Sequence, residues 1–496
     1  MSIWARKSID VLVSEAESSA AAASGLRRSL GLWNLTSIGV GCTIGAGIFV
    51  LTGTAAATYA GPAVSLSFLL AALACLFAAL CYAELAAMIP VSGSAYTYAY
   101  ATLGELVAWI IGWNLILEYL ISASTVAVGW SGYFSALLQD YGLSLPAALT
   151  TPPLARSVAG HWIFSGVVVN VPAVGIVLAL TAALSAGIRS SAIVNNAMVL
   201  VKVLVIVLVI ACGVWYVNAD NWTPFVPANT GEPGSFGWSG VVRAAGIVFF
   251  AYIGFDAVST SAQEAKNPRR DVPLALLITI GVCTALYIAM TLVMTGMAHY
   301  TKLNVPHPVF EAVNQAGPAL AWLKPVISIG AVVGLASAIL TTLYGQIRIF
   351  YAMGRDGIIP PSFARIHERL RVPVQGTWYC GIGAAAIAGV FPIELLGELA
   401  SIGTLLAFAI VCLGVLALRY ARPDAPRPFR VPCGVPVSIV GAAVCVWLML
   451  SLPSDTWVRL AAWLALGFAI YFGYGYRNSR LRAPPDQTAN GQTVKP

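Results

Sequence analysis

Gly39 to Val50 reads GVGCTIGAGIFV and Phe249 to Thr260 reads FFAYIGFDAVST. Each stretch places glycine inside an apolar segment where a membrane helix is normally continuous, and glycine removes the side-chain bulk and the φ restriction that keep a helix regular. The first stretch lies in the first apolar segment of the chain and the second lies in the sixth. Such a pair of interrupted segments, one opening each half of a bundle, indicates the binding site of a secondary transporter.

The composition is that of a membrane protein. Of the 496 residues, 59% are hydrophobic and 9% are charged, and the mean hydropathy is +0.82; these values exclude a soluble domain of this length. A helix needs about 20 apolar residues to cross about 30 Å of hydrocarbon. We therefore predict an all-α membrane protein with twelve transmembrane helices. The predicted spans are residues 32–58, 63–89, 104–138, 161–187, 192–217, 239–262, 273–297, 326–353, 376–392, 396–419, 434–452 and 457–475.

Basic residues predict the orientation. Most Lys and Arg residues fall in the segments that share a side with the N-terminus, and such an excess is typical of the cytoplasmic side. We expect a multi-pass protein of the cell (inner) membrane with both termini in the cytoplasm. The net charge of +7 then faces anionic membrane lipids and requires no nucleic-acid partner. Residues 1–31 are expected to form a cytoplasmic segment rather than a signal peptide, and residues 477–496 a disordered cytoplasmic tail.

No motif indicates an enzyme, a cofactor or a metal centre. The nine Cys are scattered through apolar spans without a CxxC pair and are interpreted as small buried hydrophobic residues. His161, His299, His307 and His367 fall in loops or at span ends, without metal-ligand spacing. An intramembrane protease would need an HExxH motif or a nucleophile–base pair within a span, and neither is present. We expect no catalytic residue and no metal.

The interrupted segments offer unpaired backbone groups at membrane depth. Such groups are tolerated only where they line a cavity or hold a ligand. An amino acid is a suitable ligand, because its carboxylate suits the freed N–H groups and positive end of a half-helix and its ammonium suits freed carbonyls. The alternative for the first segment is close helix packing, since Gly41 to Gly45 is itself a GxxxG motif. In the second segment, Phe255 follows Gly254 and is expected to cover a bound ligand as a lid.

Further motifs follow in order along almost the whole chain. They are Tyr82 to Leu85 (YAEL), Pro90 to Tyr98 (PVSGSAYTY), Asn114 to Tyr119 (NLILEY), Glu264 to Pro273 (EAKNPRRDVP), Tyr351 to Gly357 (YAMGRDG) and Phe429 to Pro432 (FRVP). With the two interrupted segments, they make the chain resemble the bacterial, twelve-span form of the cationic amino acid transporter family, within the amino acid-polyamine-organocation superfamily.

The resemblance implies a leucine-transporter-like fold. Spans 1–5 and 6–10 would form a five-plus-five inverted repeat with discontinuous helices 1 and 6. Residues 32–425 would form this transport core, and residues 426–476 would form two peripheral spans.

The resemblance also implies where an amino acid binds. Its carboxylate would meet the amides of Ala46 and Gly47, and its ammonium would meet backbone carbonyls of both interrupted spans. Ala46 departs from the Ser or Thr common at its position, which removes a hydroxyl but keeps the amide. The substrate-binding residues expected from the resemblance are Thr43, Ile44, Gly45, Ala46, Gly47, Phe250, Ala251, Ile253 and Phe255.

Lys202 lies within the apolar run AMVLVKVLVIVL, about 15 Å of helix from the cytoplasmic end of span 5. A charge at this depth costs several kcal/mol or more, so such a lysine usually faces the bundle interior. In the family resembled here, a lysine at this place lies where sodium-coupled relatives bind sodium. Because burial disfavours the charged form of lysine, we expect Lys202 to take part in proton coupling. The alternative is a permanently charged brace on the carbonyls of the unwound first span.

Three carboxylates also lie within spans. Glu84 is expected to pair with Lys202, another cation or backbone donors. Glu118 either favours a substrate with a cationic side chain or makes a structural hydrogen bond. Asp256 is expected to cap or brace the interrupted sixth span.

Basic residues outside these sites have simpler expectations. Arg243 is expected to reach the outer interface. Lys266, Arg269, Arg270 and Arg355 either form contacts of a cytoplasmic gate or simply follow the positive-inside bias.

The function predicted is a proton-coupled L-amino acid symporter that works by alternating access. An exchanger or facilitator of the same fold and a polyamine transporter are the alternatives, and a small single-span subunit is left open as a further partner. A channel would need a selectivity ring made by several chains, which an interrupted pair within one chain does not favour. The side chain of the substrate, cationic or small and neutral, is left open.

Overall fold

The chain folds into long apolar helices that run side by side. In a computed structural model, residues 4–7, 30–89, 91, 93–156, 162–164, 166–186, 192–232, 234–370 and 372–480 are described. The longest helices are α4 (Val64–Met88), α6 (Glu105–Asp140), α9 (Ala192–Gly213), α12 (Pro268–Met297), α14 (Leu323–Arg355), α15 (Val374–Val390), α16 (Ile393–Ala421), α17 (Gly434–Ser451) and α18 (Ser454–Ile470). Shorter helices are α2 (Leu32–Thr43), α3 (Thr52–Ala55), α5 (Ser94–Thr102), α7 (Ala147–Thr150), α8 (Val171–Ser185), α10 (Gly237–Val248), α11 (Ala257–Thr260), α13 (Pro308–Gln315) and α19 (Tyr476–Asn478).

Eight helical stretches within the described residues are long and apolar enough to cross a membrane. They are Gly47–Met88, Glu105–Asp140, Asn196–Tyr216, Gly237–Thr260, Pro268–Met297, Leu323–Arg355, Ile393–Ala421 and Ser454–Asn478. Val171–Ser185 and Gly434–Leu450 are apolar but shorter. The structure thus supports a helical, multi-pass membrane protein, and the count of twelve spans stays a prediction.

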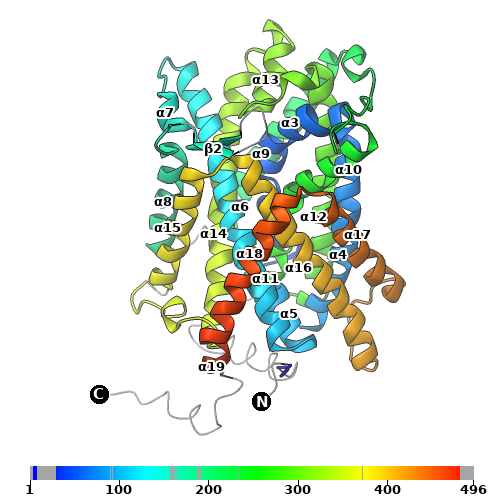
Figure 1. The fold of residues 1–496 in the computed structure, drawn as a ribbon, viewed down its shortest axis with the longest axis vertical. Helices are drawn as coiled ribbons and strands as arrows, with labels where there is room; N and C mark the ends of the chain where they lie inside the picture. The colour runs from blue at the N-terminus through cyan, green and yellow to red at the C-terminus, as the bar shows by residue number, and fades with distance from the viewer. Residues whose placement is uncertain are drawn as a thin grey trace.

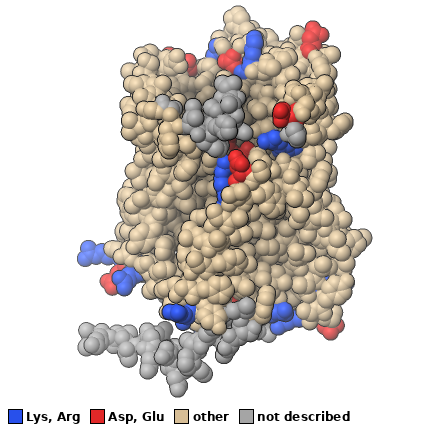
Figure 2. Space-filling view, viewed as in Figure 1, with Lys and Arg blue, Asp and Glu red and all other residues tan. Residues whose placement is uncertain are grey.

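The long axis of the bundle has two ends. Helices α5 and α19 lie at one end, here called the terminal end, and α13 lies at the opposite end (Figure 1). Figure 2 shows charged side chains gathered near the two ends of the visible face, around a broad uncharged band with one charged group in its upper part. This distribution suits a bilayer around the middle of the bundle.

The predicted fourth span, 161–187, begins too early. Trp162–Phe164 forms strand β2, which pairs antiparallel with β1, Leu154–Arg156. The helix α8 starts only at Val171, because Asn170 provides its N-cap: the side-chain oxygen accepts a hydrogen bond from the Ala173 amide at 3.2 Å. Hydropathy alone placed the start of this span too early, because an apolar strand and an apolar helix turn have the same hydropathy.

Helix α18 is attached to α6 by aromatic rings. Trp113 stacks on Trp463 of α18 with centroids 4.5 Å apart, and each indole N–H donates to the backbone carbonyl of the other residue, at 2.8 and 3.2 Å. Trp109 continues the stack on α6 and donates to the carbonyl of Gly467 at 3.0 Å. A side chain at Gly467 would collide with the Trp113 ring, so this glycine allows the close approach.

Both chain ends contact the terminal end of α6. The buried carboxylate of Glu105 accepts hydrogen bonds from Tyr100 at 3.0 Å, from Tyr471 at 2.8 Å and from Ser479 at 2.5 Å. The backbone N–H of Glu105 donates to the carbonyl of Ala5 at 3.0 Å. The predicted tail therefore starts with ordered residues, and its residues 481–496, like residues 8–29 of the predicted N-terminal segment, lie outside the described part of the chain.

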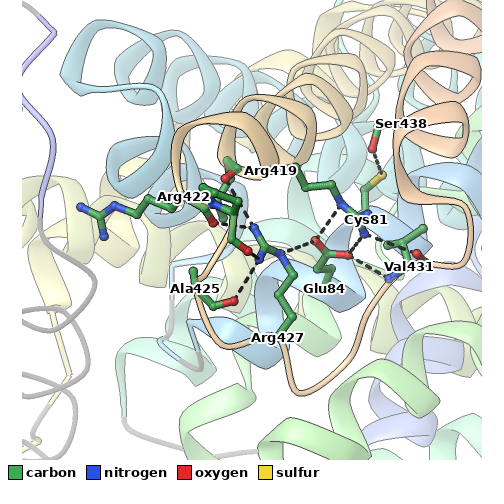
Figure 3. A network of polar contacts seen from close by, with 10 residues as sticks. Cys81, Glu84, Arg419, Arg422, Ala425, Arg427, Val431 and Ser438 are labelled. Atoms are coloured by element: carbon green, nitrogen blue, oxygen red, sulfur yellow. Dashed lines mark hydrogen bonds and ion pairs between the residues drawn. The ribbon is translucent and has the colours of Figure 1, made fainter.

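Glu84 is the centre of a buried charge network near the terminal end of α4 (Figure 3). Its carboxylate pairs with Arg419 of α16 at 2.5 Å and with Arg427 at 3.3 Å, and it accepts a hydrogen bond from the Val431 amide at 2.8 Å. Among the predicted partners of Glu84, another cation and a backbone donor are thus correct, and Lys202 is not. The network brings the YAEL and FRVP motifs together and fixes the loop that leads to α17.

Removing this carboxylate should destabilise the fold. In Glu84→Ala, two mostly buried arginines would lose their counter-charge, and breaking a buried ion pair by removing one partner costs about 3–5 kcal/mol. We expect a clear fall in the melting temperature of the purified protein in detergent. Glu232→Ala, at an exposed position, serves as the control. Equal melting temperatures for the two variants would contradict the structural role of the network.

Candidate functional site

The first interrupted segment is unwound in the structure. Helix α2 ends at Thr43, and Ile44 has the extended angles φ −75° and ψ 99°. A π-helical turn, Gly47–Leu51, then starts the second half of the span. Because the first N–H groups of a helix have no partner within it, the amides at the start of this turn can meet an anion.

The second interrupted segment is unwound at Ile253 and Gly254. Helix α10 passes into a 3-10 turn, Phe249–Tyr252, and α11 starts only at Ala257. Gly254 has φ +106°, and a Cβ atom there would lie 3.0 Å from the Cβ of Cys42. Glycine suits this position for two reasons: the backbone is left-handed there, and it lies close to the first span.

The two unwound segments touch. A Cβ atom on Gly47 would collide with the backbone and side chain of Ala251. Gly39 is also a packing glycine, because a Cβ atom there would collide with Thr279 of α12. By contrast, a Cβ atom on Gly45 would make ordinary contacts of 3.6 Å with Val126 and 3.7 Å with Ala338. The glycines of the first segment therefore serve close packing as well as unwinding.

Tyr287 of α12 links the two segments. Its hydroxyl lies 3.0 Å from the carbonyl oxygen of Thr43 and 2.8 Å from that of Ala251. Its side chain is fully buried.

A small cavity lies at the junction of the two unwound segments. Its walls come from both unwound segments and from α6 and α14. The lining residues are Cys42, Thr43, Gly45, Glu118, Tyr119, Ser122, Val126, Phe250, Ile253, Gly254 and Thr342. Four of the expected substrate-binding residues thus line the cavity; Ile44, Ala46 and Ala251 are direct chain neighbours of these four, and Gly47 follows Ala46.

Phe255, expected as the lid, does not line this cavity. Its ring packs between Tyr82 and Phe408, at centroid distances of 6.0 and 5.1 Å. Phe250 is the aromatic residue in the cavity wall. Sequence proximity to Gly254 could not show this, because the left-handed turn there changes the direction in which the next side chain points.

Lys202 lies behind the first unwound segment and is fully buried. Its Nζ donates to the carbonyls of Gly41 at 2.5 Å and of Ile44 at 2.9 Å, and to the hydroxyl of Ser337 on α14 at 3.4 Å. Three oxygens from two spans around one ammonium resemble a cation site that the protein fills with its own side chain. Gly334, one turn from Ser337, allows the stem of Lys202 to pass.

Two buried carboxylates lie near the cavity: Glu118 lines it, and Asp256 accepts a hydrogen bond from the lining residue Tyr119. Neither carboxylate oxygen of Glu118 has a hydrogen-bond partner among the described residues. Oδ2 of Asp256 accepts hydrogen bonds from Ser94 and from Tyr119, both at 3.3 Å, while Oδ1 has no partner in the described part of the chain. The Asp256 side chain makes no cap hydrogen bond to α11. It instead braces the sixth span against α5 and α6.

On the terminal side of the unwound segments, further contacts join the first span, the sixth span and α14. Arg348 of α14 pairs with Glu264 and donates to the carbonyl of Thr260 at 3.3 Å. Leu30, just before α2, forms a parallel bridge with Ala265.

Of the basic residues expected near a cytoplasmic gate, Lys266 takes part in these contacts through its backbone, whose N–H donates to the carbonyl of Leu30 at 2.8 Å. Lys266, Arg269 and Arg270 are exposed, and the guanidinium of Arg355 lies 6.0 Å from the ring centroid of Tyr351. Arg243 stacks on the ring of Tyr59 at 4.8 Å.

Several site residues escaped the sequence argument. Tyr287, Ser337, Thr342 and Arg348 belong to no interrupted segment and to none of the quoted motifs; Tyr119 is the last residue of the NLILEY motif, but no role was predicted for it. Their types are common in apolar helices, so only packing distinguishes them. No group of His, Cys, Asp and Glu that could hold a metal occurs among the described residues; His161 lies outside them.

Comparison with known proteins agrees with this geometry. The family model described as amino acid permease matches residues 30–470. The chain is 46% identical to the branched-chain amino acid permease BcaP of Bacillus subtilis (strain 168), over 97% of this chain and 99% of the relative. It is 45% identical to the methylthioribose transporter of the same organism, with the same coverage. It is 37% identical to the vacuolar cationic amino acid transporter 4 of Arabidopsis thaliana, over 83% of this chain and 65% of the relative.

These relatives are transporters rather than enzymes, and the match spans both unwound segments and the cavity between them. The chain belongs to the amino acid permease family of the amino acid-polyamine-organocation superfamily.

Proposed function

We propose that this permease carries L-amino acids in symport with protons by alternating access. The observation that carries the proposal is that two unwound segments meet at one cavity. The termini would lie in the cytoplasm of a bacterial cell, and residues 32–425 would form the five-plus-five transport core. An exchanger or facilitator of the same fold is the alternative.

The backbone would hold the part common to all amino acids. The substrate carboxylate would meet the amides of Ala46 and Gly47 at the positive start of the second half-helix. The ammonium would meet the carbonyls of Thr43 and of Phe250, Ala251 and Ile253. Phe250 would cover the substrate, because it is the aromatic residue at the cavity wall.

Lys202 would carry the transported proton. Its three oxygen partners explain how a charged lysine is stabilised when the first span is unwound as described. Loss of the proton would remove the charge that attracts both carbonyls, so protonation and the position of α2 would be coupled. The competing role is a fixed brace that keeps its charge throughout.

The side chain of the substrate would contact residues of α6 and α14. The Glu118 carboxylate lines the cavity and makes no hydrogen bond of normal geometry to the described residues, so we propose that it favours a cationic side chain. The relatives compared above are named for branched-chain amino acids, for cationic amino acids and for methylthioribose. Methylthioribose has neither an ammonium nor a carboxylate, and it is therefore the informative competitor.

Proteoliposome uptake tests coupling. Labelled L-amino acids and methylthioribose are offered with and without an inward proton gradient, and we expect the gradient to stimulate uptake of the preferred amino acid. Lys202→Met should abolish this stimulation. Lys202→Arg separates the two roles, because arginine keeps hydrogen-bond donors but not the ability to lose its proton: retained coupling in this variant would contradict proton transfer by Lys202. Lys302→Met, at an exposed position, is the control.

Two glycine variants test the contact of the unwound segments. Gly47→Ala adds a methyl group that collides with Ala251, whereas Gly45→Ala adds one at ordinary contact distance. We expect Gly47→Ala to lower binding of every transported amino acid at least about tenfold, equivalent to about 1.4 kcal/mol, and Gly45→Ala to stay within about threefold of wild type. Binding is measured by ligand-induced thermal shift of purified protein. Selective loss of some amino acids only would contradict recognition through the backbone.

Glu118→Gln tests the reading of the side chain. A hydrogen bond to a charged group is worth about 1.5–3 kcal/mol, so we expect KM for L-arginine to rise at least about tenfold and KM for L-leucine to change little. Equal changes for both amino acids would assign Glu118 a structural role.

A further inference from the structure

Tyr287 brings one hydroxyl to the carbonyls of both unwound segments. The distances of 3.0 Å to the Thr43 oxygen and 2.8 Å to the Ala251 oxygen are both within hydrogen-bond range. These carbonyls belong to residues far apart in the sequence, and one side chain of α12 fixes their separation.

The hydroxyl has a single hydrogen for two acceptors. A tyrosine donates one hydrogen bond and can accept others, so at any moment one of the two carbonyls faces the hydroxyl oxygen without a hydrogen between them. The hydroxyl oxygen of Tyr287 and the carbonyl oxygens of Thr43 and Ala251 therefore share one hydrogen at a fully buried side chain. A group that brings several N–H donors relieves this arrangement, because it can donate to the free carbonyl and to the hydroxyl oxygen at once.

The position of this hydroxyl is fixed by its ring. The ring of Tyr287 packs against Phe68 and Tyr252, each with centroids 5.3 Å apart. The hydroxyl of Tyr252 donates to the carbonyl of Phe68 at 3.1 Å and contacts neither Thr43 nor Ala251 through a described hydrogen bond. Tyr252 is therefore a neighbour with the same chemistry, the same burial and no link between the two segments.

We propose that Tyr287 is a positioning residue, which holds the Thr43 and Ala251 carbonyls at the spacing that accepts an ammonium group. The proposal rests on the proposed function, in which these carbonyls receive the substrate's ammonium. The two side chains then have different roles at the first unwound segment. Lys202 holds the carbonyls of Gly41 and Ile44, and Tyr287 positions the carbonyl of Thr43 for the substrate.

The test compares Tyr287→Phe with Tyr252→Phe in proteoliposomes, using whichever L-amino acid wild type takes up best. Both variants lose one buried hydroxyl and keep the ring. Tyr287→Phe should raise KM about tenfold or more with kcat within about threefold, the pattern expected when an interaction present throughout binding and transport is lost. Tyr252→Phe should leave KM within about twofold of wild type.

A second measurement separates positioning from a merely structural role. Inhibition of uptake is measured with the same amino acid and with its N,N-dimethyl derivative, whose nitrogen keeps a single N–H donor. In Tyr287→Phe the preference for the unmethylated form should fall at least about threefold, and in Tyr252→Phe it should not change. Melting temperatures without ligand should fall by similar amounts in the two variants.

The outcomes are distinguishable. If wild type takes up no amino acid, the proposed function fails. If wild type transports but Tyr287→Phe keeps the wild-type KM and N-methyl preference, only the positioning role is overturned. A loss of kcat and melting temperature with unchanged KM also overturns it. Should Tyr287→Phe not accumulate, Tyr287→Met, a flexible apolar side chain, is tested against the same criteria.

Discussion

The structure depends on the need to satisfy backbone carbonyls in an unwound helix at membrane depth. Water is not available there, and each unpaired polar group costs several kcal/mol. The carbonyls of Gly41 and Ile44 are met by Lys202, and those of Thr43 and Ala251 by Tyr287. These two side chains belong to α9 and α12, so hydrogen bonds from neighbouring helices stabilise the unwound segments. The cavity exists because other helices supply the donors that the interrupted helices lack.

Buried charge is treated in two ways within one bundle. Glu84 is paired with Arg419 and Arg427, does not line the cavity and secures a loop. Glu118 makes no hydrogen bond of normal geometry to the described residues and lines the cavity. Burying a carboxylate without a counter-charge is unfavourable, and such a cost is tolerated where function needs the group. The contrast between two similar residues thus separates a structural carboxylate from one available to a ligand.

Much of the site followed from short-range patterns. The glycines around Gly45 and the sequence next to Gly254 predicted both interruptions, since glycine content and hydropathy are local properties. Lys202 stood out because a single charge in an apolar run is costly wherever the helix packs. The lid role of Phe255 stays a prediction: Phe250 and not Phe255 lines the cavity, and this depends on the direction of the backbone after the left-handed Gly254. The start of the fourth predicted span was wrong, because an apolar strand pair and an apolar helix have the same hydropathy.

By itself, the sequence determined that the chain is a helical membrane protein with two interrupted spans and one unusual lysine, because composition, glycine spacing and isolated charge act along the chain. Only the tertiary structure decided which residues meet. In the tertiary structure, Glu84 forms an ion pair with Arg419 rather than with Lys202. The ring of Phe255 packs against Phe408 outside the cavity lining, and the hydroxyl of Tyr287 contacts both unwound segments. The physical reason is that these choices depend on distances between helices far apart in sequence, and residue type alone does not encode those distances.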